Sequence, residues 1–562
     1  MNDLVERESK PGPEESSPGW FWPVLGLAIF LSVPYYFSLE TFFSHDDFVI
    51  LWFHKDWPLL KPWAFFQTDV LTFYRPLQDY ALAVLFHFFD MIPFPYCVVL
   101  VAIHLANIVL FGRMVDRLFE SRPLTFLATM FFAANWQYWE VVSWKGCYGT
   151  ALSWLFAMGA CNLFVDHLRD RRWLRYLGAF GLAVGALLSK ETAINLPLLF
   201  CLIYWVLMPR MALPLRGAEA QGPEMPPKEG RNPDAIRRLF DFVRLLLPFF
   251  LLVGAYVIFY FRFVRDVYTW IPKGYEWQGP VPAIAAVFHA MTFWLVSAVR
   301  AAVEVLVSAR PREAILVWFA GHAFLSYILP LALVAAAVTF GNRRLAFGII
   351  WSVFAFFPAN FTPIYDISRY YYGAVMGVAI IWAELFLAAD RAIVRRWRFP
   401  AVAASRVAGC LVILFFVHAN LFLATSIVNF DNGKCREIED LYHFLVKQRG
   451  YFPSKTLFEV RCVNRDLHFH EGMGLREMFK LALEDDSIEA ILPDQRLANE
   501  ALTYLLRAYP KPVLVLRDRF GRHTFRVPVP KPTIETPAAS PSGPPRESSR
   551  HLERKLEAKS GN

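Results

Sequence analysis

The sequence has few charged residues for its length. Among its 562 residues, 19% are charged and 56% are hydrophobic, and the mean hydropathy is +0.34. Soluble domains carry about 25% charged and about 45–50% apolar residues, so this apolar excess cannot be buried in a water-soluble core. The apolar residues form repeated segments of about 20, the length of a membrane-spanning helix. We therefore expect an α-helical polytopic membrane protein and exclude single-span receptors, disordered chains and nucleic-acid partners.

Cysteine motifs for metal or redox chemistry are also lacking. The seven cysteines include no C-x-x-C pair or other zinc spacing. Five lie in or beside apolar segments, where a thiol is usually a small buried hydrophobic group. Only Cys435 and Cys462 share a hydrophilic region, and a disulfide between them is an open alternative if that region is extracytoplasmic.

The apolar segments set the expected topology. Residues 1–19 lack the basic region and cleavage site of a secretory signal, so we expect a cytoplasmic tail followed by a retained anchor. We predict eleven spans, near residues 20–39, 95–112, 123–141, 148–166, 174–189, 193–208, 245–262, 315–340, 345–358, 371–389 and 406–428. Lys and Arg are concentrated in alternate connections, which places the N-terminus in the cytoplasm. This orientation requires 283–308 to be an interfacial helix outside; counting it as a span gives twelve.

The predicted topology divides the chain into regions. The regions are a cytoplasmic tail (1–19), a transmembrane domain (20–428) with a first outer loop (40–94), an extracytoplasmic α/β domain (429–530) and a disordered tail rich in Pro and Ser (531–562). Within the small domain, alternation and periodicity predict strands at 457–463 and 513–516 and helices at 474–483 and 499–509.

Two adjacent carboxylates, Asp46 and Asp47, follow the first span. Adjacent carboxylates beside an apolar surface repel one another unless a cation or a proton relay uses them. They are candidates for a general base and a metal ligand. The alternative is a solvated loop in which Ser44 or Asp46 caps a helix.

A second motif, Tyr74-Arg75-Pro76-Leu77, lies further along the same loop. Pro76 suits the first turn of a helix, and we expect that helix to lie along the membrane surface and end near Phe89. The guanidinium of Arg75 can bind a phosphate bidentately, or it can extend to lipid headgroups.

Two later outer connections carry further charges. Lys190 and Glu191 lie between two closely joined spans, where a short ion pair is the alternative to a chemical role. Arg369 and Tyr370 lie at the entrance of a late span, where topology does not require an Arg. Together with the acidic pair and Arg75, these residues predict an interfacial pocket with carboxylates on one side and phosphate-compatible cations on the other.

In these four motifs the sequence resembles the GT-C glycosyltransferases, in particular the protein O-mannosyltransferase-like branch that includes the transmembrane-and-TPR O-mannosyltransferases. The resemblance covers roughly residues 20–428 and rests on the order and spacing of the motifs. The chain departs from that branch at its C-terminus, where a small α/β segment stands in place of a TPR array.

The resemblance implies roles for the site residues. The first-loop acid is the base, for which Asp46 is favoured, and Asp47 orients it or helps to bind a divalent cation such as Mg²⁺ or Mn²⁺. Donor phosphate binding falls to Arg75, Lys190 and Arg369, with supporting roles for Tyr74, Glu191 and Tyr370. Members of the family differ in metal dependence, so the metal stays open.

The predicted function follows from the outward orientation. Nucleotide sugars stay in the cytoplasm, so an outward-facing transferase needs a sugar carried on a polyprenyl phosphate. We expect inverting transfer to a protein, lipid or glycan acceptor at the outer face of the bacterial inner (plasma) membrane. The alternative is a secondary transporter or lipid flippase, although such proteins favour ionisable residues at the bilayer midplane and inverted repeats.

Overall fold

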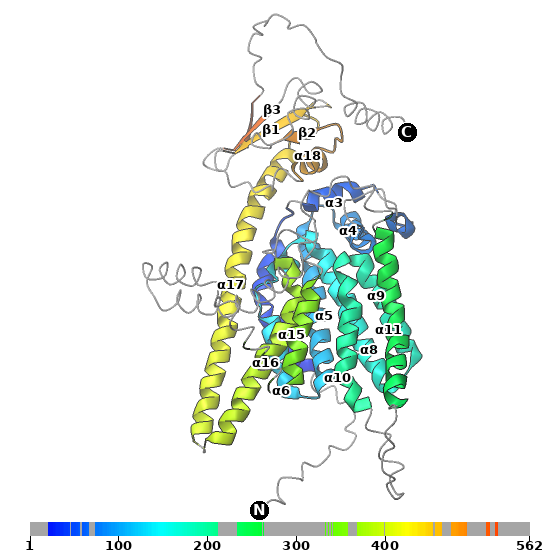
Figure 1. Ribbon diagram of the computed structural model, residues 1–562. Coiled ribbons are helices and arrows are strands. Elements are labelled where there is room, and N and C mark those ends of the chain that lie inside the picture. Colours follow the sequence, from blue (N-terminus) through cyan, green and yellow to red (C-terminus); the bar gives the residue numbers. More distant parts are fainter. Residues whose placement is uncertain are drawn as a thin grey trace, which may run out of the picture.

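In the computed structural model the chain forms a bundle of α-helices with a small sheet beyond one end (Figure 1). Besides a few isolated positions, the structure describes residues 21–44, 46–56, 59–66, 74–211, 233–260, 341–357, 368–397, 400–452, 456–462, 474–491, 513–517 and 523–526.

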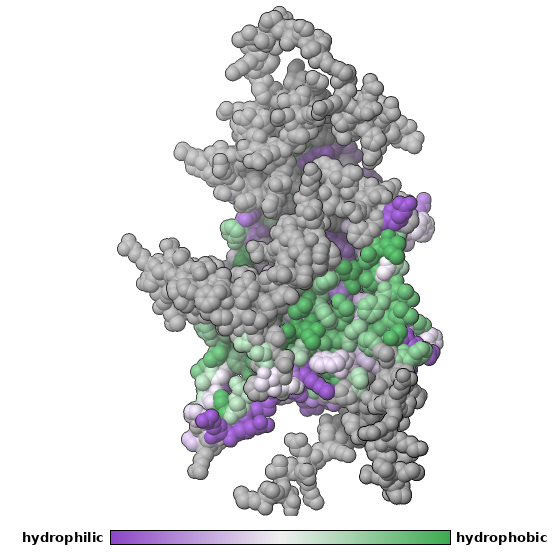
Figure 2. Space-filling model, viewed as in Figure 1, coloured by the Kyte–Doolittle hydropathy of each residue, from purple (hydrophilic) through white to green (hydrophobic). Residues whose placement is uncertain are grey.

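Among the described residues, six helices are long and apolar enough to cross a membrane. They lie within α5 (Pro93–Phe119), η4–α8 (Lys145–Cys147 and Tyr148–Asp170), η5–α10 (Glu191–Asn195 and Leu196–Met211), α11 (Pro233–Phe259), α16 (Tyr371–Arg396) and α17 (Ala401–Val446). On the face shown in Figure 2, apolar residues form a band with hydrophilic residues below and above it. The chain is an integral membrane protein, as the composition predicts.

The first apolar segment is bent rather than straight. It consists of α1 (Phe21–Leu31), α2 (Val33–Tyr36) and η2 (Phe37–Glu40), and its two halves meet at 56°. Pro34 lies at the start of the second half, where its ring and missing N–H prevent the first helix from continuing. Counted as one span, this pair raises the number of candidate spans among the described residues to seven.

The predicted span at 123–141 is interrupted. Helix α6 (Arg122–Ala133) ends and α7 (Trp139–Ser143) begins after a turn in which the Asn135 side chain accepts a hydrogen bond from the backbone N–H of Gln137 at 2.7 Å. Helices α9 (Trp173–Ser189) and α15 (Arg343–Phe356) are also shorter than a typical span. The count of eleven stays a prediction, because the expected segments 283–308 and 315–340 lie almost entirely outside the described residues.

Short helices cover the end of the bundle that faces the sheet. They are α3 (Asp46–His54), η3 (Pro62–Phe66), α4 (Pro76–Phe89), α7, η4, η5 and η9 (Ser368–Tyr370). Helix α4 begins at Pro76 and ends at Phe89, which confirms the helix predicted from the motif around Arg75. Figure 1 shows α3 and α4 at the end of the bundle nearest to α18 and the strands.

Helix α17 is longer than the predicted span 406–428. It continues without a break to Val446, because residues 435–446 keep an apolar stripe at helical spacing. The stripe consists of buried Cys435, Ile438, Leu441, Tyr442 and Leu445. Cys435 is a free thiol, so the alternative of a disulfide with Cys462 is wrong.

Beyond α17 lies a four-stranded sheet. Its strands are β1 (Leu457–Cys462), β2 (Glu489–Ile491), β3 (Val513–Arg517) and β4 (His523–Arg526), in the order β2-β1-β3-β4. Strand β1 runs parallel to β2 and β3, while β4 is antiparallel to β3. The crossover from β1 to β2 contains α18 (Leu475–Leu483). These elements match the predicted strands at 457–463 and 513–516 and the predicted helix at 474–483; the helix predicted at 499–509 lies outside the described residues.

Two glycines allow α15 and α16 to touch backbone to backbone. A Cβ on Gly377 would lie 2.5 Å from the carbonyl oxygen of Gly348, so a larger residue must push the helices apart. We expect Gly377→Ala to lower the free energy of unfolding by about 1–3 kcal/mol, measured as a lower thermal midpoint in detergent. Gly409→Ala on α17 is the matched control, because its Cβ would meet nothing within 4 Å. Equal midpoints for the two variants would contradict this packing.

Candidate functional site

The outer segments bring three of the predicted motifs together around one side chain. The charged neighbours of the Cys147 thiol are Arg369, Lys190, Glu140 and Asp47. Lys190 in turn has Arg75 and Glu191 beside it. Segments separated by more than 300 residues in the chain therefore meet at the end of the bundle that faces the sheet.

Asp47 is the buried acid of this site. Only 3% of its surface is exposed, and its Oδ2 accepts a hydrogen bond from the backbone N–H of Ser44 at 2.9 Å. Its Oδ1 is buried and has no hydrogen-bond partner within the described part of the chain. Burial raises the pKa of Asp47 to about 7, although Lys145 opposes the rise. The carboxyl group therefore changes its protonation state near neutral pH.

Lys145 is a site residue that the sequence analysis did not identify. Its ammonium is buried and donates hydrogen bonds to the carbonyl oxygens of Thr41 and, at 3.0 Å, Phe42. It also lies 5.2 Å from the centre of the Phe43 ring. Lys145 thus holds the chain that leads into α3 and supplies the positive charge beside Asp47. The criterion that selected Arg369, a single cation in a short outer connection, would also have selected Lys145.

Arg75 and Glu191 form a bidentate ion pair. Arg75 Nε donates to Glu191 Oε2 at 2.9 Å, and Arg75 Nη2 donates to Oε1 at 2.6 Å. The bidentate partner of Glu191 is thus Arg75 of another segment, while Lys190 is a charged neighbour of Glu191. Arg75 is the residue before Pro76, which starts α4, and its backbone (φ −135°, ψ 58°) lies outside the helical region. Tyr74, which precedes Arg75 in the chain, packs its ring against Phe259 with the ring centres 5.1 Å apart.

Asp79, one turn into α4, is a second buried acid that the sequence analysis did not single out. Burial raises its pKa to about 8, with Arg75 opposing the rise. At neutral pH this group is mostly protonated, so it does not compete with Glu191 for the Arg75 guanidinium.

Lys190 is the most deeply buried of the predicted phosphate ligands. Its Nζ donates a hydrogen bond to Thr150 Oγ1, and only 3% of the residue surface is exposed. Burial, followed by the nearby charge of Arg75, lowers the pKa of Lys190 to about 7. Lys190 therefore loses its charge near neutrality unless an anion binds beside it.

Tyr370 lies between two of the cations. The Lys190 ammonium and the Arg369 guanidinium each lie 5.6 Å from its ring centre, and the guanidinium also lies 5.1 Å from the Trp144 ring. The backbone N–H of Arg369 donates to Glu140 Oε2 at 3.2 Å, which fixes the start of η9. The Tyr370 ring thus contacts two cations, and its supporting role stays a prediction.

The donor set around Asp47 does not fit a divalent cation. Within the described residues no three His, Cys, Asp or Glu side chains are arranged to hold a metal ion, and the charged groups beside Asp47 are the Lys145 ammonium and the Asp46 carboxylate. Asp46 is half-buried at the first turn of α3, and His45 lies outside the described residues. We therefore derive no step through a metal.

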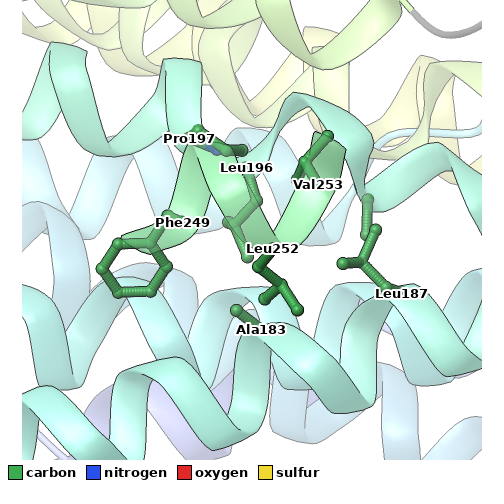
Figure 3. Close-up of a pocket in the computed structure, with 8 residues that line it drawn as sticks. Ala183, Leu187, Leu196, Pro197, Phe249, Leu252 and Val253 are labelled. Carbon is green, nitrogen blue, oxygen red and sulfur yellow. The ribbon is translucent and has the colours of Figure 1, made fainter. Parts of the chain in front are cut away.

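A narrow apolar pocket, with no room for a water molecule, lies between α9, η5, α10 and α11 (Figure 3). It is lined by Ala183, Leu187, Ala193, Leu196, Pro197, Phe249, Leu252 and Val253. Glu191 begins the short helix η5 that leads into its Leu196 wall. On α11, Tyr256 follows Val253 by one turn and has Glu191 and Arg75 as charged neighbours. The pocket thus adjoins the charged site within the apolar part of the bundle.

The arrangement can perform two kinds of chemistry. Asp47 can accept a proton near neutral pH, and the cations of Lys190, Arg369 and Arg75 can stabilise an anion that forms nearby. An apolar chain attached to that anion would find apolar walls directly beside the charged groups.

Comparison with known proteins yields distant structural likenesses. No family model and no curated protein matches the chain. ArnT from Cupriavidus metallidurans, solved with bound undecaprenyl phosphate, covers 90% of this chain and 94% of its own at 11% identity and a TM-score of 0.43. The Archaeoglobus fulgidus oligosaccharyltransferase, tethered to an acceptor peptide, covers 89% and 69% at 12% identity and a TM-score of 0.47. Both neighbours are GT-C glycosyltransferases; a likeness this distant establishes neither a family nor an activity for this chain, and the O-mannosyltransferase branch stays a prediction.

Proposed function

We propose that this protein transfers a sugar from a polyprenyl-phosphate donor to a hydroxyl group of an acceptor at the outer face of a membrane. One observation carries the proposal: Asp47, whose pKa is about 7, shares its surroundings with the cations of Lys190 and Arg369 around Cys147. A base and an anion site in one place are what glycosyl transfer from a phosphate requires.

The donor phosphate lies among the cations in this proposal. Lys190 and Arg369 approach the Tyr370 ring from two segments, and Arg75 lies beside Lys190. The first isoprene units lie against the apolar side chains of α9 and α11, near the η5 helix that Glu191 begins. This placement puts the charged head at the outer interface and the tail among apolar helices.

The chemical step moves one sugar and one proton. The acceptor oxygen forms a bond to the anomeric carbon while the bond from that carbon to the phosphate oxygen breaks, and the phosphate leaves with the electron pair. Asp47 takes the proton of the acceptor hydroxyl, and the cations stabilise the charge that grows on the phosphate. Attack opposite to the leaving phosphate inverts the anomeric configuration.

We assign the base to Asp47 rather than to the neighbouring Asp46. A general base works best with a pKa near the working pH, and burial brings Asp47 into that range. The charge of Asp46 contributes to the raised pKa of Asp47, so Asp46 has the supporting role. The acceptor is a protein, lipid or glycan hydroxyl on the extracytoplasmic side of the bacterial inner membrane.

The direct test is transfer by the purified protein in lipid nanodiscs. A radiolabelled polyprenyl-phosphate sugar is incubated with extracts of envelope proteins, lipids and glycans, and mass spectrometry of cells with and without the protein identifies the acceptor. We expect label to move to an acceptor and free polyprenyl phosphate to appear. Movement of the intact donor across a liposome membrane without cleavage would favour the transporter or flippase alternative.

The pH dependence of kcat/KM tests the two buried titrating groups. Below pH about 7 Asp47 is protonated and cannot accept a proton; above pH about 7 Lys190 loses the charge that binds phosphate. We therefore expect a narrow bell-shaped profile with its maximum near neutrality. Lys190→Arg keeps its charge at high pH, so the alkaline limb disappears and the acid limb remains. A flat profile between pH 5 and 9 would contradict these assignments.

A further inference from the structure

Helix α3 connects the site to the C-terminal sheet domain. Asp47 lies in its first turn, whereas Trp52 and Lys55 lie at its far end, about 12 Å further along the helix axis for Lys55. Asp47, Phe48 and Leu51 are buried. Trp52 and Lys55 lie on a neighbouring side of the helix. A nine-residue helix is marginal by itself, so its orientation depends on the surfaces that pack against it.

The far end of α3 is held by the turn between α18 and β2. Asp486 in that turn accepts a hydrogen bond from the Trp52 indole Nε1 at 2.9 Å and forms an ion pair with Lys55 Nζ at 2.5 Å. From α18, Lys480 places its Nζ 4.9 Å from the centre of the Trp52 ring. The C-terminal domain therefore contacts α3 through the indole from two directions, its edge and its face.

The Asp486 side chain is presented by local structure of the C-terminal domain. Its neighbour Asp485 accepts hydrogen bonds from both the backbone N–H (2.8 Å) and the hydroxyl (2.6 Å) of Ser487, which fixes the turn. On the other side, Lys480 is almost fully buried. Two fixed groups of one domain thus meet a short helix of the other.

We propose that Trp52 and Asp486 form a latch through which the C-terminal domain positions Asp47. This inference rests on the proposed function, because it assigns a role in catalysis to a contact remote from the reacting atoms. Trp52 and Asp486 are positioning residues: they act on the acceptor proton only through α3. Through the latch, a structural change in the C-terminal domain alters the position of the Asp47 carboxylate.

Asp486→Ala is the first variant that tests the latch. Loss of both contacts lets α3 tilt about its buried face, and displacing a catalytic group by about 1 Å can cost up to about 100-fold in rate. We expect kcat to fall by about 10-fold to 100-fold while KM for the polyprenyl-phosphate sugar stays within about twofold, since the phosphate ligands are on other elements. Hydrogen exchange of the α3 amides should become faster in the same variant.

Two further variants separate positioning from general damage. The exchanged pair Lys55→Asp/Asp486→Lys restores the ion pair but not the hydrogen bond from the Trp52 indole, because a lysine ammonium accepts no hydrogen bond. It should therefore recover part of the lost kcat and partly slow α3 exchange. The matched control is Glu484→Gln, which removes a 2.6 Å ion pair with Arg449 in the turn after α17. It lies two residues from Asp486 and should change neither readout.

Each outcome decides the proposal. If the α3 amides of Asp486→Ala exchange at the wild-type rate, the latch is overturned. If they exchange faster while kcat is unchanged, the position of Asp47 does not depend on the latch, and the proposal is overturned as well. If no sugar transfer is detected even for the wild-type protein, the proposed function fails; the exchange experiment on the full chain then decides by itself whether the C-terminal domain holds α3.

Discussion

Replacing Asp47 with asparagine should lower the rate of sugar transfer by about 10²–10⁴-fold, the usual contribution of a positioned base. Asparagine has the same shape, and its oxygen can still accept the hydrogen bond from the Ser44 N–H. The loss therefore reports on proton transfer rather than on the shape of the loop. The measurement is single-turnover transfer from a labelled polyprenyl-phosphate sugar in nanodiscs.

Asp46→Asn is the matched control for this experiment. It removes a neighbouring charge that contributes to the raised pKa of Asp47, so we expect the acid limb of the pH profile to move to lower pH with only a modest loss of kcat. If Asp46→Asn loses its transfer activity while Asp47→Asn keeps it, the base is Asp46, as the sequence analysis favoured. Wild-type rates for both variants would show that neither carboxylate is a base.

Arg75→Gln should have the second largest effect. Removing one group that stabilises the leaving phosphate typically costs about 10²–10³-fold in kcat. The same change leaves the Glu191 carboxylate without its bidentate partner in a partly buried place, and breaking such a pair destabilises the fold by up to about 3–5 kcal/mol. Transfer rate and thermal midpoint should both fall.

The double variant Arg75→Gln/Glu191→Gln separates these two causes. With both charges removed, no uncompensated carboxylate remains, so the thermal midpoint should recover. The transfer rate should stay low, because the phosphate still lacks the guanidinium. Recovery of the rate together with the midpoint would show that Arg75 serves only to neutralise Glu191.

The local features of the sequence predicted several elements correctly. Apolar segments of span length reappear as α5, α8, α10 and α16, and Pro76 begins α4. The reason is that hydrophobic periodicity and the conformation of proline act within a few residues. A hydropathy window misses a helix break that a single polar side chain causes, as Asn135 does by accepting a backbone hydrogen bond in the turn after α6.

Pairings between distant segments could not be predicted in this way. The sequence marked Arg75 and Glu191 as separate charges of two outer loops, and only the packing of α4 against the η5 segment makes them a pair. Lys145 was not singled out from the sequence, and only the structure placed it against the carbonyl oxygens of Thr41 and Phe42 and beside Asp47. Charge alone does not specify a partner more than 100 residues away.

The shortage of charge in the sequence by itself determined that this chain belongs in a membrane and that its few outer charges are unusual, because the cost of placing ions in hydrocarbon applies whatever the fold. Only the tertiary structure decided which of those charges share a site. It buried Asp47 and Lys190 around one shared side chain, Cys147, and brought the pKa of each to about 7. Desolvation and Coulomb interactions depend on distances in space, which the order of residues does not contain.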